Sequence, residues 1–125
     1  MAKKILIVDD ERPIRILLER TLEKFEDLGV ELLTAENGEE GLEIIKTEKP
    51  NLVFLDVMMP KMDGFTVCNT VKNDLKMKDV YIVMLTAKGQ EFDKQKGQEV
   101  GADIYMTKPF NPADIAKKAE EVLGL

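Results

Sequence analysis

Polar residues able to do chemistry follow four of the apolar runs in this sequence. Asp9 and Asp10 come directly after the run at 5–8, and Asp56 comes directly after the run at 52–55. Thr86 follows the run at 80–85, and Lys108 lies two residues beyond the run at 104–106. Carboxylates can hold a divalent cation or act as nucleophiles, while a hydroxyl and an ammonium group can each neutralise an anion.

The residues that are missing narrow the chemistry further. The chain contains no histidine, which excludes Ser-His-Asp and Cys-His nucleophile schemes in their usual form and metal sites built on histidine. The single cysteine, Cys68, rules out an internal disulfide and fits a cytoplasmic protein. Because Cys68 falls on an apolar stripe, we expect it in the core. Any reaction must therefore run on carboxylates, hydroxyls and lysines.

Composition indicates one soluble globular domain over residues 1–125. The chain is 44% hydrophobic and 34% charged, with a formal net charge of −6 and a pI near 4.8. This acidic balance disfavours direct nucleic-acid binding. No apolar run approaches the roughly 18 residues of a membrane span, and the run after the first lysines is too short for a signal peptide.

Short apolar runs recur along the chain and indicate strands. Most are continuous and rich in β-branched or aromatic residues, which is typical of strands covered on both faces of a parallel sheet. The run at 30–35 alternates more and is expected near an edge of the sheet. The five predicted strands lie at 5–8, 30–33, 52–55, 80–85 and 104–106.

Between these runs the apolar period becomes helical. Asn37 and Asn111 have the character of helix N-caps, and Gly124 is expected to end the last helix. The segment at 89–100 has few apolar residues and an internal glycine, so we expect a weak and mobile fourth helix there. The apolar stripes that predict the other helices are Ile14, Leu17, Leu18, Thr21, Leu22 and Phe25; Leu42 and Ile45; Val67, Cys68, Val71 and Leu75; and Ile115, Ala119 and Val122.

Five strand–helix units in succession predict an α/β fold with a mostly parallel sheet and helices on both faces. Ligands bind such sheets at the carboxyl ends of the strands. With the first strand central, Asp9, Asp10 and Asp56 crowd together at that end. Like charges crowd there only with a cation, and an all-oxygen site open to water suits Mg²⁺.

The same residues make a complete site for phosphoryl transfer. Asp56 beside a metal can accept a phosphoryl group, whose three equatorial oxygens need neutralisation. The metal, Lys108 and the Thr86 hydroxyl would each take one oxygen. Taken singly, each residue has an ordinary explanation as a loop residue, a helix cap or a surface lysine. Their joint placement at four strand ends favours the functional interpretation.

The chain closely resembles the receiver domain of two-component response regulators, over essentially its whole length. Each matching motif is weak alone, but their order and spacing together are specific. The motifs are Ile-Val-Asp-Asp-Glu at 7–11, Leu-Asp-Val-Met-Met-Pro at 55–60, Met-Asp-Gly at 62–64, Leu-Thr-Ala at 85–87, Gly-Ala-Asp at 101–103 and Lys-Pro-Phe at 108–110.

The resemblance implies a flavodoxin-like, doubly wound (βα)5 fold with strand order 2-1-3-4-5. It also implies that a histidine kinase or phosphotransfer protein donates to Asp56. Direct Mg²⁺ ligands would be Asp10, Asp56 and the Met58 carbonyl, with Asp9 acting mainly through water. Lys108 would contact the phosphoryl group, and its bond to Pro109 is expected to be cis.

The resemblance further implies a switch. Thr86 and Tyr105 match the family's switch pair, in which the hydroxyl moves toward the phosphoryl group and the ring turns inward. Since a weak helix beside a new charge suits a bistable switch, we expect the output surface on the fourth helix, the fifth strand and the fifth helix. That surface is also the expected site of any phosphorylation-dependent dimer.

The predicted chain is a phosphoacceptor that catalyses its own phosphorylation and slow dephosphorylation, and is not otherwise an enzyme. Neither Met58 nor Lys88, two residues beyond Asp56 and Thr86, can orient a water for hydrolysis. Three alternatives stand beside this interpretation. They are an aspartyl phosphatase, disfavoured by Met58; a flavin carrier, disfavoured by the acidic loop at 9–11; and a receiver-like domain that is never phosphorylated. The output partner or effector domain is open, as is whether the chain stands alone.

Overall fold

Five parallel strands form a single sheet in the computed structural model, which describes residues 2–87, 96 and 98–125. The strands are β1 (Lys4–Val8), β2 (Glu31–Ala35), β3 (Leu52–Asp56), β4 (Tyr81–Ala87) and β5 (Ile104–Lys108). Their order across the sheet is β2-β1-β3-β4-β5, which confirms the predicted doubly wound fold. The run at 30–35 indeed supplies an edge strand.

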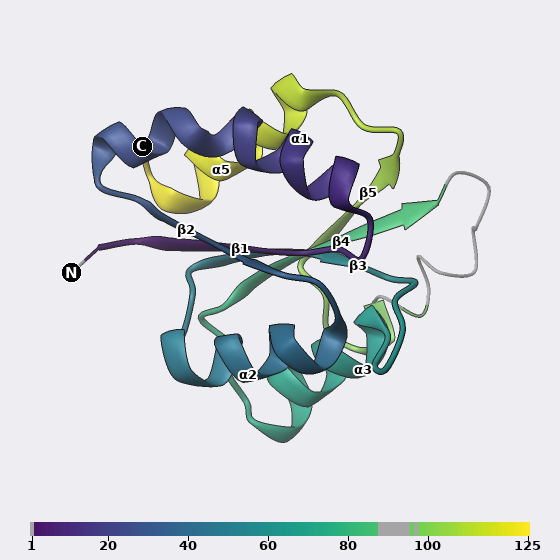
Figure 1. Cartoon of the computed structure of the whole chain (residues 1–125). Coiled ribbons are helices and arrows are strands. Elements are labelled where there is room, and N and C mark those ends of the chain that lie inside the picture. Colours follow the sequence, from purple (N-terminus) through teal and green to yellow (C-terminus); the bar gives the residue numbers. More distant parts are fainter. Residues whose placement is uncertain (1, 88–95, 97) are drawn as a thin grey trace.

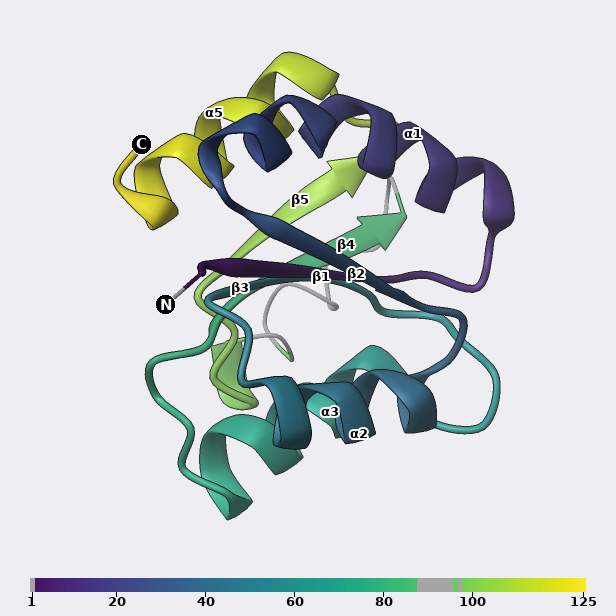
Figure 2. The same ribbon diagram turned by 60° about the vertical axis from the view of Figure 1, so that its left-hand side comes forward.

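Helices cover both faces of this sheet. Figure 1 and Figure 2 show α1 and α5 together on one face and α2 and α3 together on the other. The helical segments are α1 (Arg12–Leu22), a 3₁₀ segment η1 (Glu23–Leu28), α2 (Gly38–Glu48), α3 (Gly64–Asn69), a π-helical segment η2 (Thr70–Asp74) and α5 (Pro112–Leu123). Most of the fourth helix predicted over 89–100 lies outside the described residues, so its existence and mobility stay predictions.

The helix ends follow from local hydrogen bonding, as predicted. The Asn37 side chain accepts a bond from the Glu40 amide at 2.9 Å and begins α2. The Asn111 side chain accepts one from the Ala113 amide at 2.9 Å and begins α5. At the end of α5, Gly124 adopts a left-handed conformation with φ of 70°, which glycine reaches without a steric cost.

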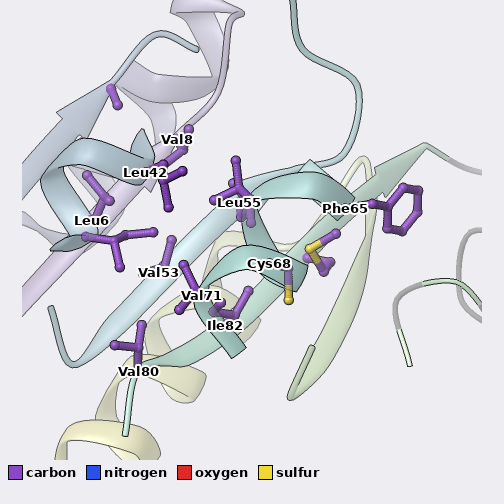
Figure 3. Packing of buried hydrophobic residues seen from close by; sticks show 14 of the residues in the cluster. Leu6, Val8, Leu42, Val53, Leu55, Phe65, Cys68, Val71, Val80 and Ile82 are labelled. Carbon is purple, nitrogen blue, oxygen red and sulfur yellow. The ribbon is translucent and has the colours of Figure 1, made fainter. Parts of the chain in front are cut away.

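Two apolar clusters lie on opposite faces of the sheet because successive strand residues point to opposite sides. In β1, Ile5 and Ile7 pack toward α1 and α5, whereas Leu6 and Val8 pack toward α2 and α3. Figure 3 shows the second cluster, which includes the buried Cys68. Strand β1 is therefore buried on both sides, as its continuous apolar run indicates.

Two leucines of the predicted apolar stripes are exposed. Leu17 is 39% exposed, because it lies on the flank of α1 with Thr21, whose hydroxyl bonds the Leu17 carbonyl. Leu75 is 42% exposed, because the chain widens into η2 after Asn69 and the 3.6-residue spacing of the stripe breaks there. Lys72, only 4% exposed, is buried on this segment instead.

Strand β5 extends further than its apolar run. Lys108 belongs to the strand, paired with Ala87 of β4, rather than following it. In the part of the chain that the structure describes, no helix is both long and apolar enough to cross a membrane.

Candidate functional site

Four carboxylates meet at the carboxyl end of β1 and β3. These strands are neighbours, with Val8 paired to Leu55, so the residues that follow each pair lie side by side. Asp56 is the last residue of β3 and is 5% exposed, while Asp9 is fully buried and Asp10 is exposed. Carboxylate oxygens of Asp9, Asp10, Glu11 and Asp56 all lie within 4.8 Å of one another. The structure thus gathers the three predicted carboxylates and adds Glu11.

Lys108 joins this cluster from the end of β5. Its Nζ lies 2.9 Å from Asp9 Oδ2 and 3.1 Å from Asp56 Oδ1, and 3.6 Å from Glu11 Oε1. The ammonium group thereby bridges two buried carboxylates that would otherwise repel each other. One lysine does not balance four carboxylates, so the cluster keeps a net negative charge that favours a cation.

The pKa of the Asp56 carboxyl is raised to about 7 from an ordinary value of 3.8. Burial is the main cause and repulsion from Asp9 adds to it, while attraction to Lys108 opposes both. For the Lys108 ammonium, burial acts to lower the pKa, but hydrogen bonds and attraction to Asp9 and Asp56 outweigh it and raise the pKa. The site is therefore built to keep Lys108 charged while Asp56 is poised to release its proton.

Hydrogen bonds fix both the main chain and the side chain of Asp9. Its amide donates to the Ala35 carbonyl at 3.2 Å, and its Oδ1 accepts from the Glu11 amide at 2.9 Å. Its Oδ2 faces Lys108, and its own carbonyl accepts from Arg15 Nη1 at 2.7 Å. These contacts make Asp9 the fixed point of the cluster, whereas Asp10 faces solvent.

The loop after β3 is pressed against the site. The Gly64 amide donates to the Val57 carbonyl at 2.8 Å, and a Cβ at Gly64 would lie 2.2 Å from the Asp56 carbonyl oxygen. Only glycine fits this approach. The Asp63 side chain caps α3 by accepting from the Thr66 amide at 2.8 Å. These contacts explain why Asp63 and Gly64 stand where α3 begins.

The remaining predicted features are Thr86, Tyr105, Met58 and the bond between Lys108 and Pro109. Thr86 is 2% exposed and is the last but one residue of β4. Tyr105 is half-buried in β5. It packs against the apolar cluster that lies between the sheet and helices α2 and α3. Met58 is 66% exposed in the loop after β3. The bond between Lys108 and Pro109 is cis, as the resemblance implies.

Sequence reasoning did not predict the contacts of Glu11 and Arg15 at the site. Glu11 belongs to the carboxylate cluster, and only its position beside Asp10 hinted at this. Arg15 occupies the α1 face of Leu18 and Leu22, at spacings of three and seven residues. A charged residue at such a position signals a buried partner, but spacing alone does not identify that partner.

The donor set fits a divalent cation. Hard cations such as Mg²⁺ take oxygen ligands, and the four clustered carboxylates offer them at one partly open edge of the sheet. Asp10 and Glu11 leave the cluster accessible to water, which Mg²⁺ retains in most protein sites.

Comparisons with known proteins identify the family of the chain. The family model described as "Response regulator receiver domain" matches residues 5–120. The chain is 49% identical to the "Alkaline phosphatase synthesis transcriptional regulatory protein PhoP" of Bacillus subtilis over 98% of this chain and 49% of that protein. It thus spans about half the length of the curated relatives it matches.

Solved structures share the fold across the chain. A putative response regulator from Chloroflexus aurantiacus matches with a TM-score of 0.86 and 34% identity, covering 100% of both chains. The chemotaxis response regulator CheY4 of Vibrio cholerae matches with a TM-score of 0.83 and 35% identity, covering 98% of this chain and 99% of that one. The chain belongs to the response regulator receiver domain family of two-component signalling.

Proposed function

We propose that Asp56 accepts a phosphoryl group from a phosphohistidine of a histidine kinase or phosphotransfer protein, in a reaction that depends on Mg²⁺. The observation that carries this proposal is the placement of Asp56, buried at a strand end, 3.1 Å from Lys108 and within a cluster of carboxylates. Membership of the receiver family supports the same chemistry.

Mg²⁺ would be held by the Asp10 and Asp56 carboxylates and the Met58 carbonyl, with Asp9 acting mainly through water. The engagement of both Asp9 oxygens with Glu11 and Lys108 supports this indirect role. When bound, the cation neutralises charge on the phosphoryl oxygens and favours the ionised form of Asp56.

In the transfer, an Asp56 carboxylate oxygen forms a bond to phosphorus while the phosphorus–nitrogen bond of the donor breaks. The imidazole leaves with the electron pair and takes up a proton from water. Lys108 already lies beside Asp56 and donates to one phosphoryl oxygen, and the Thr86 hydroxyl donates to another. The product is an aspartyl phosphate on Asp56, and the chain supplies positioning and charge rather than turnover.

The decisive experiment uses a small phosphoryl donor. Incubation with acetyl phosphate and Mg²⁺ is expected to add one phosphoryl group by intact mass, because Asp56 is the buried nucleophile beside Lys108. Asp56→Asn should abolish the adduct, and so should EDTA. Asp63→Asn keeps a helix cap and serves as the matched control that should still be labelled. An adduct that persists in Asp56→Asn would overturn the assignment.

The label should be lost slowly, over many minutes rather than seconds. Met58 is exposed beside the site and carries neither a carboxylate nor an amide to orient an attacking water. Lys88, the other residue predicted to matter, lies outside the described residues. Met58→Glu is expected to speed the loss about tenfold, with Met58→Leu as the control, measured by the decay of the phosphorylated mass after donor removal. Equal decay in all three proteins would remove Met58 from the explanation.

Thr86 and Tyr105 are proposed as the switch pair. Tyr105 pairs with Met84 across the two strands, and Thr86 lies two residues beyond Met84, so both side chains belong to the same face of the sheet. A shift of the Thr86 hydroxyl toward a phosphoryl group would open space on the face where Tyr105 packs. The output surface would then comprise β5, α5 and the predicted fourth helix, which also offers the dimer contact.

We also propose that residues 1–125 form one receiver domain, in a cytoplasmic protein, that does not itself bind nucleic acid. The formal charge of −6 supports the last point. The relative named as a transcriptional regulatory protein is about twice as long as this chain. The output partner or effector domain and the cognate kinase stay open.

A further inference from the structure

Arg15 reaches from α1 to the main chain of the carboxylate cluster. Its Nη1 donates to the Asp9 carbonyl at 2.7 Å, and its side chain is only 12% exposed. Its other contact, Nη2 to Glu36 Oε1 at 3.7 Å, involves a glutamate side chain that is 73% exposed and therefore contributes little. From this geometry we infer that Arg15 is a positioning residue for cation binding at the site, an inference that rests on the proposed function.

The bonded carbonyl governs where Asp10 lies. The Asp9 carbonyl and the Asp10 amide share one planar peptide unit, so a donor on that oxygen fixes the rotation of the whole unit. The Asp9 amide is fixed in turn by the Ala35 carbonyl, and the Asp9 side chain by Lys108. Asp10 is exposed, so its position depends on this backbone rather than on packing.

Positioning and charge predict opposite effects on cation affinity. Arg15 carries a permanent positive charge near four carboxylates, and charge alone would repel Mg²⁺. Removing that charge would then tighten binding. If Arg15 instead orients the peptide that carries Asp10, its removal weakens binding. The direction of the change separates the two roles.

The test measures Mg²⁺ affinity of the full chain by isothermal titration calorimetry. Arg15→Met is expected to raise the dissociation constant about tenfold, the usual effect of losing a residue that orients a metal ligand. Arg15→Lys retains the charge and one donor and should bind with intermediate affinity. Arg20→Met removes the same charge from the exposed last turn of α1 and should bind like the unmodified chain.

Each outcome supports or overturns the inference. An unchanged or lower dissociation constant for Arg15→Met overturns it, even if the unmodified chain binds Mg²⁺ and is phosphorylated. Failure of the unmodified chain to bind Mg²⁺ or to form the adduct refutes the proposed function instead. If Arg15→Met does not fold by circular dichroism, Arg15→Gln takes its place under the same tenfold criterion.

Discussion

Burial of the Asp56 carboxyl at the end of β3 makes the stability of the fold depend on pH. The unfolded chain returns this carboxyl to its ordinary pKa of 3.8, whereas the fold raises the pKa to about 7. The folded chain therefore binds the proton more tightly between these values, and its stability falls as pH rises through them. Ionising the buried Asp56 carboxyl costs free energy, and a bound cation would reduce that cost.

This pH dependence of stability can be measured in the absence of metal. In EDTA, Asp56→Asn should melt higher than the unmodified chain at pH 8, because the variant has no buried carboxylate to ionise. One pKa unit corresponds to about 1.4 kcal/mol, and screening by Lys108 and by solvent at the mouth of the site reduces the gain to about 1–3 kcal/mol.

The gain should shrink as pH falls toward 4, where Asp56 is protonated in the folded chain. Thermal melts by circular dichroism at several pH values provide the measurement, with Asp63→Asn as control. A gain of equal size at pH 4 and pH 8 would rule out ionisation of Asp56 as its source.

At the scale of elements, the buried Lys72 contacts residues of two other segments at the amino end of the sheet. Lys72 Nζ, from η2, lies 2.9 Å from Asp103 Oδ2 and 2.5 Å from the Val80 carbonyl. The same Asp103 oxygen accepts from the Ile82 amide at 2.8 Å. The π-helical segment, the start of β4 and the turn before β5 therefore share one polar contact.

Lys72→Met is expected to destabilise the fold by about 2 kcal/mol, because it leaves the buried Val80 carbonyl without this donor and removes the cation beside Asp103. Urea denaturation measures the change. Lys118→Met is the control, since the exposed pair of Lys118 and Glu121 should contribute under about 0.5 kcal/mol. Equal effects of the two substitutions would show that the Lys72 pair adds nothing beyond a surface pair.

Local rules explain which elements were predictable from sequence. Asn37 and Asn111 start their helices through bonds to amides two or three residues away, so a short window contains the whole signal. The stripe through Val67, Cys68 and Val71 predicted α3 for the same reason. It misplaced Leu75 because the π-helical segment changes the period, and no local pattern announces such a change.

Some residues of the candidate site could also be predicted from the sequence, and others could not. Parallel strands bring their carboxyl ends to one edge of the sheet, so the sequence was enough to select candidate site residues there. These candidates are Asp9, Asp10, Asp56, Thr86 and Lys108. The contact of Arg15 with the Asp9 carbonyl was not predictable, because it depends on how α1 is tilted over the sheet. Glu11 was visible in the sequence, but only distances distinguish a member of the cluster from a loop residue.

At the scale of the molecule, two cores share one sheet. Leu22 belongs to the cluster under α1 and α5, and Ile45 belongs to the cluster under α2 and α3. Because β1, β3 and β4 contribute side chains to both clusters, loss of packing on one face must disturb the other. The chain should therefore unfold in one cooperative transition.

The substitutions Leu22→Ala and Ile45→Ala should each lower the free energy of unfolding by about 3 kcal/mol and shift the whole transition. Leu28→Ala is the control and should change stability little, because the Leu28 side chain is exposed. The two tyrosines report on the two faces, since Tyr81 packs on the first cluster and Tyr105 on the second. Near-ultraviolet circular dichroism of Tyr81→Phe and Tyr105→Phe measures each face separately. Melting at different temperatures would show that the faces unfold independently.

The first and last described residues lie at the end of the sheet away from the carboxylates. Lys3 Nζ donates to the Leu123 carbonyl, and Figure 2 shows the start of β1 and the end of α5 on the same side. A five-residue strand, roughly 16 Å long, separates them from the site. Fluorophores, surface tethers or fusion partners attached at either end should leave the carboxylate cluster accessible. A short flexible linker joining the ends would permit circular permutation, so the fold could serve as a scaffold for a sensor of the phosphorylation proposed at Asp56.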